Sequence, residues 1–99
     1  MSVKGQLHTC RDVLLAAMKK AERFECTQSV KVIRACLDLV EHMEHTADKV
    51  TQNELDVTLK VLNQAVKDVD DKSAVAPALV GALKNAVGRL ESVRTEIPA

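Results

Sequence analysis

Apolar residues recur every three or four positions through the first part of the chain, at Val3, Leu7, Cys10, Leu14, Ala17, Ala21 and Phe24. On an α-helix these positions form a single apolar stripe along one face. Most of the stability of an amphipathic helix comes from packing of its apolar face, so the stripe must be covered by another element. The spacing therefore predicts a helix over about 4–24 that packs against further helices.

A second helix is predicted over about 28–48, because the apolar series resumes out of phase after the first stripe. A phase jump indicates a break even where Gly and Pro are absent. Thr27 or Ser29 is the expected N-cap, since a hydroxyl there can accept a hydrogen bond from a free backbone N–H. The second stripe comprises Cys26, Val30, Ile33, Leu37 and Val40.

Two more helices follow, each preceded by a local start signal. Thr51-Gln52-Asn53-Glu54 matches a capping box and predicts a third helix over about 52–70. The stretch 70–73 predicts a turn, with Ser73 capping a fourth helix over about 74–95 that carries Pro77 in its first turn. Their stripes are Leu55, Leu59, Leu62, Val66 and Val69, then Ala76, Leu79, Val80, Leu83, Val87 and Leu90.

Four striped helices joined by short connections predict an all-α fold, an up-down-up-down antiparallel four-helix bundle, in one domain spanning residues 1–99. No segment alternates strictly over six residues, which argues against strands despite the many valines. The main alternative fuses the first two segments into one long helix and completes the bundle by dimerisation.

The composition narrows the function classes. The chain is 46% hydrophobic but 1% aromatic, so its core must be aliphatic and lacks the rings that dominate cofactor pockets and base-stacking surfaces. Fourteen basic and fourteen acidic residues leave no net charge to favour nucleic acid. No apolar run of membrane-spanning length and no signal peptide is visible, so neither membrane insertion nor secretion is expected.

The three cysteines lack a CxxC pair and predict free thiols in a reducing, cytoplasmic setting. Cys10 and Cys36 fall on apolar stripes, where they are expected to pack in the core. Cys26 lies near a helix start and is expected to be reachable by thiol reagents.

One side of the predicted fourth helix carries only small, uncharged residues: Ala74, Gly81, Asn85, Gly88 and Ser92. A face of this kind allows another helix backbone to approach closely, so it is a candidate surface for self-association or partner docking. The alternative is that these are ordinary exposed small residues. Val57 and Val61 on the third helix either widen its buried arc or form a second apolar strip for a partner.

The segment 41–45 contains His42 and His45, each four residues after a carboxylate. This spacing suits metal pairs, but a dinuclear bundle site needs Glu-x-x-His motifs from two helices. Both histidines are expected to face solvent, and their acidic neighbours disfavour phosphoryl transfer. Glu44 falls in the apolar stripe, so its carboxylate needs either a cationic partner or exposure to water near a bundle end. We expect exposure.

These observations predict a non-enzymatic protein–protein interaction or adaptor bundle without a cofactor or metal. It would bind a partner helix, or a second copy of itself in an oligomer or coiled coil, through an outer helix face. The alternative is a carrier of a small apolar ligand or lipid in the bundle core, with Glu44 orienting the polar end. A metal-binding or phosphorelay bundle at His42 and His45 ranks below both.

Overall fold

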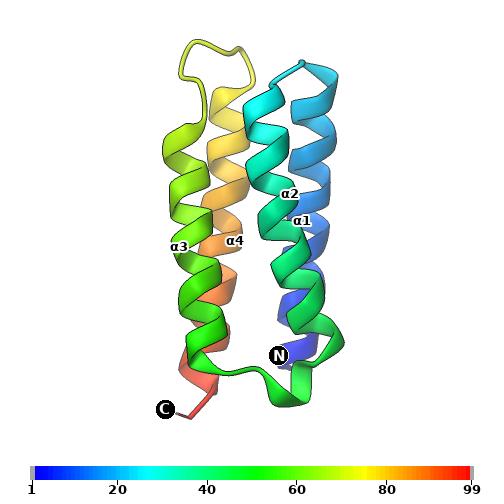
Figure 1. Ribbon diagram of the computed structural model, residues 1–99, viewed down its shortest axis with the longest axis vertical. Helices are drawn as coiled ribbons and strands as arrows, with labels where there is room; N and C mark the ends of the chain where they lie inside the picture. Colours follow the sequence, from blue (N-terminus) through cyan, green and yellow to red (C-terminus); the bar gives the residue numbers. More distant parts are fainter. Residues whose placement is uncertain (1, 99) are drawn as a thin grey trace.

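Residues 2–98, the part of the chain described by the computed structural model, form four α-helices that run up, down, up and down (Figure 1). Each helix packs against two others, so that α1 and α3 lie at opposite corners of a square. The predicted all-α antiparallel four-helix bundle is confirmed. The helices are α1 (Val3–Arg23), α2 (Thr27–His45), α3 (Gln52–Asp68) and α4 (Ala76–Glu96).

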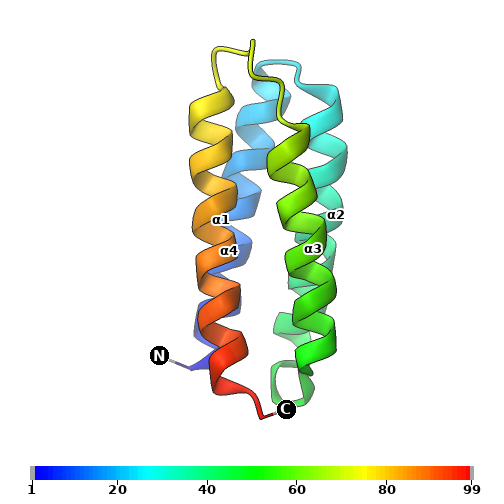
Figure 2. The same ribbon diagram turned by 90° about the vertical axis from the view of Figure 1, so that its left-hand side faces the viewer.

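The connections divide between the two ends of the bundle. The α1–α2 and α3–α4 turns lie at one end (Figure 2). The α2–α3 connection, with the short 3-10 helix η1 (Ala47–Lys49), lies at the other end, as do the start of α1 and the end of α4. The predicted bounds are right to within a few residues, but α2 ends at His45 because the chain turns into η1 there.

The α1–α2 turn reverses the chain without glycine. Glu25 adopts the left-handed conformation, with φ of 58°. The Glu25 N–H donates to the Glu22 carbonyl at 3.1 Å and the Cys26 N–H donates to the Ala21 carbonyl at 2.9 Å, the two hydrogen bonds of a Schellman motif. The alternative in which α1 and α2 fuse into one helix is therefore wrong.

This turn also corrects three details of the sequence prediction. Phe24 is the C-cap of α1 and is 51% exposed, so it does not extend the apolar stripe. Cys26, with no side-chain hydrogen bond to the helix, occupies the N-cap position of α2. Thr27 is already the first helical residue and Ser29 is buried inside the helix, so neither is a cap.

The start of α4 differs from the prediction by two residues. Ser73 does not cap the helix, because its hydroxyl accepts from the Val75 N–H at 3.3 Å and stabilises the preceding turn instead. The helix begins at Ala76, with Pro77 in its first turn as predicted. Ala74 consequently lies in the turn rather than on the outer face of α4.

The core is aliphatic and is centred on leucines that the stripes identify. Leu14, Leu62 and Leu83 are fully buried and Leu37 is 5% exposed. The structure adds side chains that lay outside the predicted stripes, because each helix turns its buried arc toward the bundle axis: Met18, Met43, Thr58, Ala65, Ala86 and Val93. The predicted positions Val3, Leu59, Val66, Val80 and Val87 are only partly buried and pack against the rim of this core.

Buried Thr58 shows how a polar group is accommodated there. Its hydroxyl donates to the Glu54 carbonyl one turn earlier at 2.8 Å. A buried hydroxyl bonded to its own helix avoids the free-energy cost of an unsatisfied donor.

The predicted capping box is present at the start of α3. The Thr51 hydroxyl accepts from the Glu54 N–H at 3.2 Å, and the Thr51 N–H donates to a Glu54 carboxylate oxygen at 3.3 Å.

We expect Thr51→Ala to lower the free energy of unfolding by about 1 kcal/mol in urea denaturation, because the cap hydrogen bond is lost. Thr51→Ser keeps the hydroxyl and is the control. An equal loss in both variants would assign the effect to the Thr51 methyl group instead.

Candidate functional site

The outer face of α4 carries Gly81, Asn85, Gly88 and Ser92, and all four are exposed. A Cβ atom added at Gly81 or Gly88 would meet nothing within 4 Å. The bundle itself therefore has no packing reason for glycine at either position. Both backbones are helical, with no positive φ that would require glycine.

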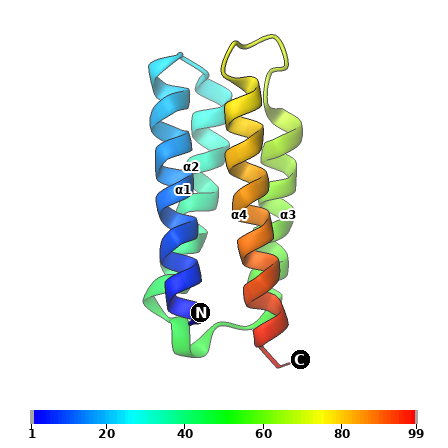
Figure 3. The ribbon, with the colours of Figure 1, turned by 180° about the vertical axis from the view of Figure 1, so that it is seen from behind.

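This face continues onto α1, which lies beside α4 (Figure 3). Between the two helices runs a shallow, largely apolar groove with Lys20 at its rim; its lining residues are Val13, Ala16, Ala17, Lys20, Ala78, Leu79 and Ala82. We call the surface formed by this groove and the four residues above the α1/α4 face. Its small side chains bring no bulk to oppose a third helix.

Sequence reasoning found the α4 half of this face and missed the α1 half. Val13 and Ala16 lie beside the α1 stripe, and nothing in the sequence states which flank of α1 adjoins α4. The sequence provided only a partial indication, since the two flanks of α1 differ in polarity. One flank carries the polar residues His8 and Arg11, and the other carries the apolar residues Val13 and Ala16.

Asn85 is held in place by an arginine on the same face. Arg89 donates through Nε to the Asn85 side-chain oxygen at 2.7 Å, and through Nη1 to the Gln6 side-chain oxygen of α1 at 3.4 Å. The second of these bonds ties α1 to α4. Among residues 2–98 the Asn85 amide nitrogen has no hydrogen-bond partner, so it can donate to an incoming group.

Only one of the two residues of the second predicted strip, on α3, is exposed to solvent. Val57 is 48% exposed, whereas Val61 is partly buried and packs against the core. Val61 therefore widens the buried arc, and Val57 alone presents apolar surface. The two residues do not form a continuous exposed strip.

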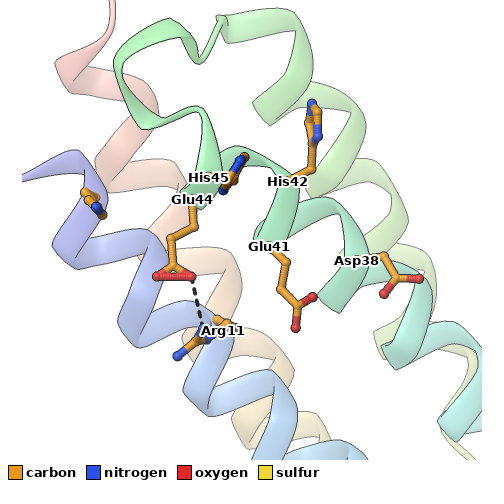
Figure 4. A pocket seen from close by; sticks show the side chains of 7 residues that line it. Arg11, Asp38, Glu41, His42, Glu44 and His45 are labelled. Atoms are coloured by element: carbon orange, nitrogen blue, oxygen red, sulfur yellow. Dashed lines mark ion pairs between the residues drawn. The ribbon is translucent and has the colours of Figure 1, made fainter.

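Between α1 and the end of α2 lies a hollow lined by charged residues (Figure 4). Its lining is Lys4, Arg11, Asp38, Glu41, His42, Glu44 and His45. In Figure 4 the His42 and His45 side chains point away from Arg11 and Glu44. Within residues 2–98 no three His, Cys, Asp or Glu side chains gather in a way that would hold a metal ion.

The expectation that Glu44 is exposed near a bundle end is wrong. Its side chain is only 14% exposed, and it bonds to α1 instead of projecting into water at a frayed end. One carboxylate oxygen lies 2.8 Å from His8 Nδ1. The other lies 3.4 Å from Arg11 Nη1 (Figure 4). The partners come from α1, so the sequence could state the need for a cation but not which residue meets it. Glu44 thus joins α1 to α2, a position unlike the one a ligand-orienting group in the core would need.

The buried cysteines are unsuited to nucleophilic chemistry. Burial raises the pKa of Cys10 to about 12 and that of Cys36 to about 11, against the 9.0 of an ordinary cysteine thiol. The nearby Arg89 lowers the Cys10 pKa by less than burial raises it. Since the thiolate is the reactive form, both thiols are inert at neutral pH. Cys26 is only partly buried, with its Sγ 3.5 Å from the Ser73 hydroxyl.

None of the helices in the described part of the chain combines the length and apolarity needed to cross a membrane. The chain matches no protein-family model, no curated protein and no solved structure. Its function therefore has to be inferred from the geometry of its own residues.

The thiols give a direct test of this burial. At pH 8 we expect a disulfide reagent to modify Cys26 rapidly, while Cys10 and Cys36 react only after denaturation, because their raised pKa keeps them protonated and the core excludes the reagent. The measurement is absorbance of the released thiolate before and after denaturant. Cys26→Ser should abolish the rapid phase. A rapid phase that survives this substitution would contradict the buried placement of the other two thiols.

Proposed function

We propose that this chain is a non-enzymatic interaction module that binds an α-helix on its α1/α4 face, either from a partner protein or from a second copy. The single observation that carries the proposal is the pair of exposed glycines in the middle of α4, which the fold does not require. Each glycine costs about 1 kcal/mol of helix stability relative to alanine. Glycine is expected at such a cost where the backbone of another helix must approach this one closely.

The shape of the face favours a helix as the occupant. Gly81, Asn85, Gly88 and Ser92 follow one another at spacings of four, three and four residues, the spacing of a seam between two packed helices. The groove of Val13 and the alanines beside it supplies apolar surface for the same occupant. Lys20 stands at the rim of this groove, where a charge guides binding without having to be buried.

The remaining features support the same class of function. The balance of fourteen basic and fourteen acidic residues gives nucleic acid no electrostatic reason to bind. Free thiols at Cys10, Cys26 and Cys36 favour a reducing compartment such as the cytoplasm.

The test replaces both glycines with leucine. We expect Gly81→Leu with Gly88→Leu to keep the helical circular dichroism spectrum and to raise the free energy of unfolding of the monomer by about 1 kcal/mol per site, because leucine is a better helix former. Association should be lost, since two large side chains now stand where a backbone must approach. Sedimentation equilibrium measures self-association, and affinity recovery from source-cell extract measures partner binding.

Two controls separate the steric effect from other causes. Gly81→Ala with Gly88→Ala raises helix propensity by a similar amount while adding only one methyl group per site, and should weaken binding much less than the leucine pair does. Ala35→Leu adds a leucine at an exposed position of α2, off the α1/α4 face, and should leave binding unchanged. If the double leucine variant associates as the original chain does, the α1/α4 face is not the binding surface.

A further inference from the structure

The small residues of α4 are placed symmetrically along the helix. Gly81 and Ser92 lie equally far from the midpoint between Ala86 and Val87, and Asn85 and Gly88 lie equally far from the same midpoint. A two-fold axis through this point, perpendicular to α4, would set an antiparallel copy of α4 against the first. Each glycine would then face a small polar residue, Gly81 against Ser92 and Gly88 against Asn85. A surface that matches itself under a two-fold axis is the requirement for a symmetric dimer.

The charges beside this row also complement each other when one copy is reversed. Lys84 and Glu91 are two turns apart, so at 100° per residue they share the flank of the row nearer α3. In the antiparallel arrangement, this flank of one copy faces the same flank of the other. Lys84 of each copy is then brought level with Glu91 of the second copy, within about one turn of the helix.

The opposite flank, nearer α1, shows a second complementary pair. Lys20 lines the groove at the end where α4 begins, and Glu96 is the last residue of α4 at the other end of the same face. Reversal of one copy places Lys20 beside Glu96 of the second copy. Among residues 2–98, the ion pairs join His8, Arg11, Asp12 and Glu44, and Asp56 with Arg94. Lys20, Lys84, Glu91 and Glu96 therefore enter none of them.

The face is close to the size that such a dimer needs. The molecule measures 40 × 19 × 19 Å, so one long side spans about 40 by 19 Å. A specific interface of standard size takes about 800 Å² from each partner. The flat area of one long side falls slightly below this value, and the relief of the side chains adds to it.

From these observations we propose that the occupant of the α1/α4 face is a second copy of this chain, bound antiparallel about a two-fold axis between Asn85 and Gly88 of α4. Lys84 meets Glu91 of the second copy, and Lys20 meets Glu96 of the second copy. This inference rests on the proposed function, because it assigns a partner to the same face.

Charge reversal and charge exchange test this arrangement. Sedimentation equilibrium would compare the original chain with Lys84→Glu, Glu91→Lys and the variant that carries both. Each single reversal places like charges together twice by symmetry, so we expect the dimer dissociation constant to rise by roughly tenfold or more at low salt. The exchanged variant restores both pairs and should return to within about threefold of the original value. Lys31→Glu, an equal charge change on exposed α2, is the matched control.

The outcomes separate this inference from the proposed function. Recovery of the dimer in the exchanged variant supports the antiparallel arrangement. A chain that remains monomeric at millimolar concentration overturns the second copy as occupant, while binding of a partner helix is still judged by the leucine variant. A dimer that the leucines disrupt, but that neither reversal weakens, overturns the arrangement and leaves the face as the binding surface.

Discussion

Burial of four aliphatic helix faces around one axis is the interaction on which every other feature of this protein depends. Each helix takes most of its stability from the packing of its apolar face and little from intrinsic propensity, so its geometry depends on the others covering that face. With Phe24 exposed, no aromatic ring contributes to that core. Leucine, valine and alanine fill it instead, and their close packing fixes how far each helix is rotated about its own axis. That rotation decides which residues reach the surface together.

The exposure of small residues along one side of α4 is a consequence of this rotation. Leu83, Ala86 and Leu90 turn inward, which leaves Gly81 and Gly88 facing solvent. The helix accepts two poor helix formers there because its stability comes from the buried side. The buried side that stabilises α4 and the proposed binding surface thus lie on opposite sides of one helix, so the outer side can be changed without damage to the core.

Polar contacts have a different role, since they join particular helices. Glu44 bonds to His8 and Arg11 across α1 and α2, Asp56 pairs with Arg94 across α3 and α4, and Arg89 reaches Gln6 across α4 and α1. Surface pairs of this kind contribute little free energy individually. They favour one set of helix neighbours over another, which the non-directional apolar core cannot do alone.

The sequence by itself determined the helices, the turns between them and the leucines of the core, because the period of apolar residues and the capping signals act within a few residues. Thr51 with Glu54 shows this well, since both members of the capping box lie in one turn. Tertiary structure alone decided that Glu44 meets Arg11, that Phe24 faces water and that Val13 and Ala16 adjoin the outer face of α4. These outcomes depend on the rotation of each helix and on the choice of its neighbours, which are set by contacts between residues far apart in the chain.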